Sequence, residues 1–463
     1  MNQTWTGLLE PSAVRAVSVP QPVPVMDHAT VAALQQLGRT EDLMFSPNGR
    51  LLAIVGHLAN EILLLRVEVK PQACGSVAIH LSAPCSLKSD HLAYPHGIGW
   101  LTDRICVVAN RQGKACVFSL PTDMSDESIH LEPELVLGAD LASPVQTPGS
   151  VSARRLAPDC WEVILCNNYS HELSQHLIEL SPSIRSVAES ILIRRDLDIP
   201  DGVAQSPDGR WMAVSNHNEH AVRLYRNRPD LAMNDHPDVR LRGVNFPHGL
   251  RFTSCGRYLL VADAGLPFVH IYESDNGDWC QAATLPQSIR VVDDQLYWRG
   301  RYNPQEGGPK GIDFVPGCNV IAVTNHEQPL AFFDLNSVVT PGSPASPLPD
   351  EHESRVVSLR RHANAQANQL RAARQEGSML TADLNGALAT VSELRQVQQT
   401  LEERDRAHRM VTEDLADKLD RCQRELNEVR ASHSWRVTAP CRMVGSWVRH
   451  CFAAVSKRPA ATP

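Results

Sequence analysis

The stretch FPHGLRFTSCGRYLLVADAG, residues 246–265, predicts two short strands joined by a tight turn. The first strand begins at Pro-His-Gly, and the second is apolar and ends at an acidic residue. Related stretches place Ser-Pro-Asn-Gly or Ser-Pro-Asp-Gly between the strands, where Pro presets φ and Gly accepts a positive φ. The plan recurs in TEDLMFSPNGRLLAIVGHLA (40–59), YPHGIGWLTDRICVVANRQG (94–113), TPGSVSARRLAPDCWEVILCNN (147–168), IPDGVAQSPDGRWMAVSNHN (199–218) and GPKGIDFVPGCNVIAVTNHE (308–327).

The spacing of these six copies indicates a repeat architecture. The intervals between equivalent positions run from 47 residues (201 to 248) to 62 residues (248 to 310), close to the period of a propeller blade. A third apolar strand follows most copies, and about four short strands repeated around an axis make a blade. A β-helix solenoid would instead need a short, constant period. The aligned positions are Asp42, His96, Pro148, Asp201, His248 and Lys310.

We therefore predict a mainly β fold: a six-bladed β-propeller with a C-terminal α-helical coiled coil and a terminal amphipathic helix. The linker SVVTPGSPASPLPDEHES is rich in Pro and Ser, which continue neither strand nor helix. After it, one heptad register runs from Val356 to Val429 and predicts an oligomerising coiled coil. The predicted segments are an N-terminal arm or closing strand (1–39), the propeller (40–336), the linker (337–354), the coiled coil (355–430) and a basic amphipathic tail (431–463).

Composition narrows the class of protein. The chain of 463 residues carries 44 Lys and Arg against 52 Asp and Glu, a net charge of −8 that disfavours nucleic acid as a partner. Its 12 cysteines form no Cys-x-x-Cys pair, and MNQTWTGLLEPSAVR lacks the apolar core of a secretory signal. We therefore expect reduced thiols in a cytoplasmic protein. Walker, nucleophile-elbow and His-Glu-x-x-His motifs are all absent from the sequence.

Polar residues recur at the start of each innermost strand and at the end of the second strand, which lie on the same face of a propeller. Asp201 precedes Asn216 by 15 residues, and His248 precedes Asp263 by 15. We predict that these residues converge on one channel mouth and bind a ligand. The alternative is that each residue ends its strand and satisfies local backbone groups. The predicted set is His57, His96, Asn110, Asn167, Asp201, Asn216, His217, His248, Asp263, Lys310, Asn325 and His326.

Carboxylate and amide oxygens suit Ca²⁺, whereas several imidazoles favour a transition metal. The propeller resembles the six-bladed gluconolactonase-like and surface-layer (YVTN-type) repeat families over residues 40 to 335. Those families include Ca²⁺-dependent lactonases and non-enzymatic binding proteins. In the lactonases one Glu, one Asn and one Asp hold the metal, which implies Asn216 and Asp263 here. An obvious Glu is missing, because Glu41 precedes the first aligned position.

The last 33 residues form a basic segment with five Lys or Arg and no acid. A helix from Pro440 would place Trp447 on an apolar face, as in helices that lie on lipid, although packing on a protein is an equal alternative. SHSWRVTAPCR (432–442) resembles an element near the end of bacterial surface-polysaccharide proteins, including those that terminate O-antigen chains. That resemblance implies recruitment to membrane-associated polysaccharide machinery. The residues expected at the membrane are Trp435, Arg436, Arg442, Trp447 and Arg449.

Two functions remain open from the sequence. The first is a non-catalytic glycan- or protein-binding scaffold for bacterial lipopolysaccharide or other surface-polysaccharide biosynthesis. It would be oligomerised by the coiled coil, partnered by polysaccharide-assembly proteins, and held by its tail at the inner face of the inner membrane. The alternative is a metal-dependent, Ca²⁺-using lactonase-type hydrolase with its site at the channel mouth.

Overall fold

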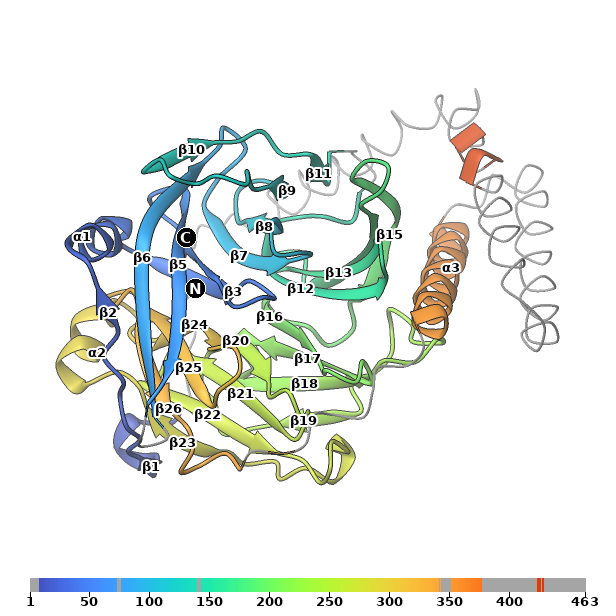
Figure 1. The fold of residues 1–463 in the computed structure, drawn as a ribbon. Helices are drawn as coiled ribbons and strands as arrows, with labels where there is room; N and C mark the ends of the chain where they lie inside the picture. The colour runs from blue at the N-terminus through green and yellow to red at the C-terminus, as the bar shows by residue number, and fades with distance from the viewer. Residues whose placement is uncertain are drawn as a thin grey trace, which may run out of the picture. The chain divides into compact units, whose positions relative to one another are not determined.

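The computed structural model describes residues 8–72, 76–139, 143–340, 342, 351–376, 423–425 and 427–428. The chain divides into two compact units, Met1–Asn368 and Gln369–Pro463. The first unit contains six β-sheets arranged around one axis (Figure 1). Innermost strands of successive blades neighbour one another, and that of the sixth blade lies beside that of the first, so the ring closes. The predicted six-bladed propeller is confirmed.

Each blade begins at the axis and is built outward from an antiparallel pair of strands. Blade one contains β3 (Thr40–Phe45), β4 (Leu51–Gly56), β5 (Glu61–Pro71) and β6 (Val77–Lys88), and blade two contains β7 (Pro95–Trp100), β8 (Ile105–Asn110), β9 (Ala115–Ser119) and β11 (Leu135–Leu137). Blade three contains β12 (Pro148–Ala157), β13 (Cys160–Asn167), β14 (Glu172–Glu179) and β15 (Arg185–Ile193), and blade four contains β16 (Pro200–Gln205), β17 (Trp211–Asn216), β18 (Ala221–Arg226) and β19 (Val239–Leu241). Blade five contains β20 (Pro247–Phe252), β21 (Tyr258–Asp263), β22 (Phe268–Glu273) and β23 (Gln287–Arg290), and blade six contains β24 (Pro309–Phe314), β25 (Val320–Asn325) and β26 (Ala331–Asp334).

Segments outside the blade plan add to two of the sheets. In the N-terminal arm, β1 (Ala16–Val17) pairs in parallel with β23 of blade five, and β2 (Val25–Met26) pairs with β6 of blade one. The strand β10 (Ser128–His130) also joins β6. The arm therefore extends blades five and one, and the described strands of blade six remain three.

Hydrophobic clusters lie between neighbouring blades, which explains the uninterrupted apolar second strands. In β4, Leu52 and Ile54 pack against blade six, whereas Ala53 and Val55 pack against blade two. Successive side chains of a strand point to opposite faces, so a strand buried on both faces is apolar at every position. Helix α1 (His28–Leu37) covers part of this core through Leu34 and Leu37.

Helices α2 and α3 lie outside the sheets. Helix α2 (Asp294–Gly300) lies between β23 and β24, and α3 runs from Glu351 to Glu376, beginning inside the segment predicted as linker. Helix α3 agrees with the helical prediction from residue 355. Most of the predicted coiled coil (377–422) and the tail (431–463) lie outside the described residues. Within the described part of the chain, every helix is too short or too polar to cross a membrane.

Candidate metal centre at the channel mouth

The second residue of every innermost strand belongs to one ring at the end of the central channel. The six strands begin at Thr40, Pro95, Pro148, Pro200, Pro247 and Pro309. Five of the six following residues carry a polar side chain, and all five are buried. The ring members are Glu41, His96, Gly149, Asp201, His248 and Lys310.

The ring corrects the sequence alignment in blades one and three. Thr40 pairs with Gly56, the last residue of β4, just as Pro95 pairs with Asn110, the last residue of β8. Glu41, not Asp42, is therefore the counterpart of His96. Glu41, which precedes the aligned position Asp42 in the sequence, is thus a central member of the ring. In blade three Gly149, not Pro148, takes the equivalent place.

Glycine at the next position explains the recurring His-Gly, Asp-Gly and Lys-Gly pairs. A Cβ on Gly97 would lie 2.6 Å from the carbonyl oxygen of Gly149, and one on Gly249 would lie 2.5 Å from that of Lys310. In blades two, four, five and six the innermost strands approach so closely at this position that a side chain would collide with the neighbouring strand. In blade one this position is Asp42, whose carboxylate accepts the backbone N–H groups of Leu43 and Ile98.

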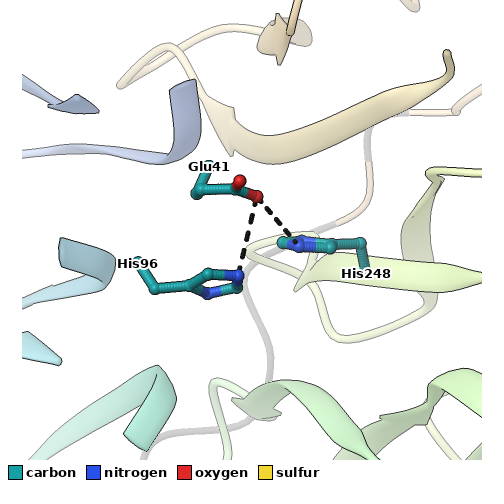
Figure 2. Close-up of side chains that lie close together, drawn as sticks. All are labelled: Glu41, His96 and His248. Atoms are coloured by element: carbon teal, nitrogen blue, oxygen red, sulfur yellow. Dashed lines mark ion pairs between the residues drawn. The ribbon is translucent and has the colours of Figure 1, made fainter. Parts of the chain in front are cut away.

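Three ring side chains have the arrangement of a metal centre. One oxygen of Glu41 and one nitrogen each of His96 and His248 lie within 4.8 Å of one another, and all three residues are buried. Figure 2 shows both imidazoles facing the Glu41 carboxylate, with each Nε2 3.5 Å from Oε2. Asp201 adds a second carboxylate, 3.3 Å from Nε2 of His248 and 4.0 Å from Nε2 of His96.

Backbone carbonyls fix the orientation of three imidazoles at this mouth. Nδ1 of His96 lies 2.7 Å from the carbonyl oxygen of Gly149, and Nδ1 of His57 lies 3.2 Å from that of Pro95. Nδ1 of His217 is 3.3 Å from a carbonyl oxygen of the next blade. A carbonyl can only accept, so each Nδ1 donates and each neutral ring keeps its lone pair on Nε2. This is the tautomer of a histidine that binds a metal through Nε2.

Positive groups balance the buried carboxylates of the ring. Lys310 Nζ lies 2.9 Å from Glu41 and 3.0 Å from Glu306, and Arg39 binds the same two carboxylates. Arg111 lies 3.3 Å from Asp201. Three carboxylates thus face three cations, and the centre is formally neutral while its imidazoles are neutral.

The pKa values follow from burial opposed by these charges. Burial alone would raise the pKa of Glu41, but Lys310 and His96 outweigh it and hold that pKa well below the usual range. Burial lowers the pKa of His96 far below its ordinary value and lowers that of His217 to about 4. At neutral pH the centre therefore presents an ionised Glu41 beside the neutral imidazoles of His96 and His217.

The structure places the sequence-predicted site residues in three groups. His96, Asp201, His248 and Lys310 are ring members. His57 and His217 border the ring and contact His96 and His248 respectively, whereas His326 contacts the ring of Tyr302. The five other residues end their second strands: Asn110, Asn167, Asn216, Asp263 and Asn325.

These strand-ending residues bond to backbone groups. Asn110 accepts the N–H of Ala93, Asn167 accepts that of Gln146, and Asn325 donates to the carbonyls of residues 307 and 308. They have the role considered as the alternative from the sequence, because each one ties the end of its strand to the segment that leads into its own blade.

The two expected metal ligands belong to this strand-ending group. Oδ1 of Asn216 accepts the backbone N–H of Asp198, and the two carboxylate oxygens of Asp263 accept those of Asn245 and Phe246. Their oxygens are thus committed to backbone donors. The candidate ligands are the ring members Glu41, His96 and His248 instead.

Five residues that contribute to the centre were missed from the sequence. Glu41 had a signal, because Thr-Glu-Asp aligns with Pro-His-Gly when the strand starts are matched. Asn168 fills the space left by Gly149 and donates to Asp201. Arg111 follows Asn110 at the repeat position that holds His217 and His326 in other blades, so the repeat marked its place. Arg39 and Glu306 lie outside the strands, where the repeat gives no signal.

Solved structures with similarity to this chain share little sequence identity with it. The chain is similar to a putative gluconolactonase, with 14% identity and a TM-score of 0.38 over 64% of this chain and 88% of that one. It is also similar to a luciferin-regenerating enzyme, with 11% identity and a TM-score of 0.44 over 68% and 97% of the two chains. No family model and no curated protein matches the sequence.

Proposed function

We propose that the propeller is a metal-dependent hydrolase that cleaves an ester or lactone at its channel mouth. One observation carries this proposal: Glu41, His96 and His248 bring three ligand atoms within 4.8 Å of one another in a buried ring. Two imidazoles and one carboxylate are the protein ligands of a class of catalytic metal sites that leave a position open for water or substrate.

The donor set favours a first-row transition metal over the Ca²⁺ expected from the sequence. Ca²⁺ takes six to eight oxygen ligands, whereas two of the three clustered donors here are imidazole nitrogens. A divalent ion such as Zn²⁺ fits the His96, His248 and Glu41 donors, with Asp201 as a further carboxylate. Such an ion supplies polarisation of a carbonyl and a lowered pKa of water.

Neutral imidazoles beside the cluster offer hydrogen-bond acceptors to water or substrate. His217 has a pKa near 4 because of burial, so it is uncharged at neutral pH. Its Nδ1 donates to the carbonyl of Pro247, which leaves Nε2 to accept a hydrogen bond. The side chains of Arg39 and Arg111 are partly exposed and lie where a substrate approaches the buried ring.

The proposal is tested by metal content and by hydrolysis in the full chain. We expect one equivalent of tightly bound transition metal, and activity on a panel of lactones and esters that chelation removes and metal restores. His248→Gln should abolish both. The matched control is His270→Gln, because His270 is a buried histidine of the same blade that bonds Ser288 and Asp263 outside the ring. A protein that binds no metal and has no chelator-sensitive activity would contradict the proposal.

We propose a separate role for the C-terminal segments on the basis of sequence. The SHSWRVTAPCR element and the basic, acid-free tail support recruitment to an anionic membrane surface, where the protein would join bacterial surface-polysaccharide assembly from the cytoplasm. The heptad register supports oligomerisation. If the metal tests fail, a glycan- or protein-binding scaffold becomes the better account of the propeller.

Deleting residues 432–463 tests this role of the tail. The truncated protein should leave the membrane fraction and keep its oligomeric state in sedimentation experiments. Unchanged membrane partition would contradict recruitment by the tail.

A further inference from the structure

Arg111 occupies the position from which a metal would approach His96. It follows β8 directly, and its Nη2 donates to Nε2 of His96 over 2.6 Å. The same nitrogen lies 3.3 Å from Oδ1 of Asp201, and the guanidinium stacks over the ring of Tyr169 at 5.5 Å. The Arg111 side chain is 17% exposed and Tyr169 is 62% exposed, so this arginine is at the solvent edge of the ring.

The hydrogen bond and a metal require the same lone pair. Nδ1 of His96 donates to the carbonyl of Gly149, so Nε2 is the one ring atom that can accept. In this structure Nε2 accepts from Arg111, and a metal coordinated by Nε2 would need that pair of electrons. Nε2 of His96 therefore cannot accept a hydrogen bond from Arg111 and coordinate a metal at the same time.

Arg39 provides an internal comparison. It also places a positive charge beside the cluster, but its Nε donates to Oε1 of Glu41. The other oxygen, Oε2, is the one that faces His96 and His248. A carboxylate offers about four lone-pair sites, so this arginine and a metal can share Glu41. The two arginines therefore have similar charge effects and different effects on ligand availability.

We infer that Arg111 is an internal competitor for the metal: it caps Nε2 of His96 when the centre is empty and is displaced toward Tyr169 when a metal binds. This inference rests on the proposed function, because it assumes that the ring takes a metal. It adds that metal affinity is set by an exchange between a guanidinium and the ion.

The test compares three full-length proteins stripped of metal: wild type, Arg111→Met and Arg39→Met. The dissociation constant for Zn²⁺ is measured by competition with a chromophoric chelator. Each variant loses one positive charge from the ring, but only Arg111→Met frees Nε2 of His96. A hydrogen bond to a charged group is worth about a tenfold to hundredfold change in an equilibrium. We therefore expect Arg111→Met to bind Zn²⁺ at least about tenfold more tightly than Arg39→Met does.

The outcomes separate this inference from the proposed function. Equal Zn²⁺ affinity in the two variants, or weaker binding in Arg111→Met, would overturn the exchange and leave the metal centre standing. Absence of Zn²⁺ binding in all three proteins would overturn the centre and the exchange together. If thermal melting shows that Arg111→Met is unfolded, Arg111→Ala and Arg39→Ala replace the pair, and tighter Zn²⁺ binding by Arg111→Ala is again required.

Discussion

Two buried glutamates sit in opposite kinds of environment in the same propeller. Glu41 and Glu162 are both 0% exposed, and both have a pKa below the ordinary value. Glu41 lies in the ring at the channel mouth, beside two imidazoles and Lys310. Glu162 lies near the start of β13, toward the end of blade three away from the mouth, and helix α3 covers it.

Both carboxylate oxygens of Glu162 accept hydrogen bonds from side chains that can donate at every pH near neutrality. One of its oxygens accepts from Ser358 and Arg361 of α3 and from Gln175, and the other accepts from Arg154 and Gln205. None of these five partners carries an imidazole or another group that titrates near neutral pH. Burial by itself would raise the pKa of Glu162, but Arg361 and Arg154 reverse the effect and bring it to about 2.

Partner chemistry distinguishes the structural carboxylate of Glu162 from the candidate ligand Glu41, because burial is the same in both. Every partner of Glu162 donates, so nothing in that cluster is left to bind an ion. The partners of Glu41 include His96 and His248, whose Nε2 atoms lie 3.5 Å away and can bind a metal. Glu162 holds helix α3 against the propeller through hydrogen bonds, whereas Glu41 lies beside the two histidines that are the other candidate metal ligands.

The largest stability effect should come from breaking the Glu162 cluster. Arg361→Ala leaves a buried carboxylate without its main counter-ion, and breaking a buried pair in this way costs about 3–5 kcal/mol. We expect a loss of this size in the free energy of unfolding measured by chemical denaturation. A loss below about 1 kcal/mol would mean that α3 is not fastened through Glu162.

A smaller effect is expected from pH at the same interface. Nδ1 of His362 lies 3.3 Å from Ser190 Oγ, and burial together with His176 lowers its pKa to about 4, although Glu189 opposes this. The unfolded imidazole titrates near 6.5, so the unfolded state gains a proton first and folding stability falls as the pH drops from about 6.5 to 4.

This pH effect can be isolated by substitution. The difference between a pKa of 6.5 in the unfolded chain and about 4 in the folded protein corresponds to about 3 kcal/mol of folding free energy. We expect His362→Gln to remove up to that much of the decline in unfolding free energy between pH 6.5 and 4. The wild type is the reference, because the two proteins share every other histidine and their difference reports on His362 alone. Identical pH profiles for the two proteins would contradict burial of a neutral imidazole at this position.

The smallest effect should come from the exposed rim of the same helix. Arg355 lies 3.2 Å from Glu179, and its side chain is 33% exposed. Exposed ion pairs contribute about 0–1 kcal/mol. Arg355→Ala should therefore change the unfolding free energy by less than about 1 kcal/mol, which makes it the matched control for Arg361→Ala on one helix.

The propeller was predictable because its repeat is local. Each copy carries its own turn and its own two strands, and the apolar second strands indicated burial on both faces. The ring was predictable only in part. The sequence alignment places blade one late by one residue, because it treats Asp42 as the ring position although Asp42 stands where most other copies have glycine.

The remaining features depend on contacts between distant segments. Glu306 lies four residues before Lys310, but it meets Arg39 only after the sixth blade closes against the first. Heptad periodicity predicted a helix around Arg361 but not its burial, since a charged side chain on a helix is normally solvated. A faint signal was Glu162 inside the apolar strand CWEVILCN, where a charge requires a buried partner.

The most direct test titrates Zn²⁺ into three metal-free, full-length proteins: wild type, Glu41→Gln and Glu162→Gln. Both substitutions remove one buried carboxylate of the propeller and keep its shape. The account predicts one bound equivalent in the wild type and in Glu162→Gln, and a loss of at least about a hundredfold in affinity in Glu41→Gln, since even the outer partners of a ligand are worth ten- to a hundredfold. Equal Zn²⁺ binding by the two variants would contradict it.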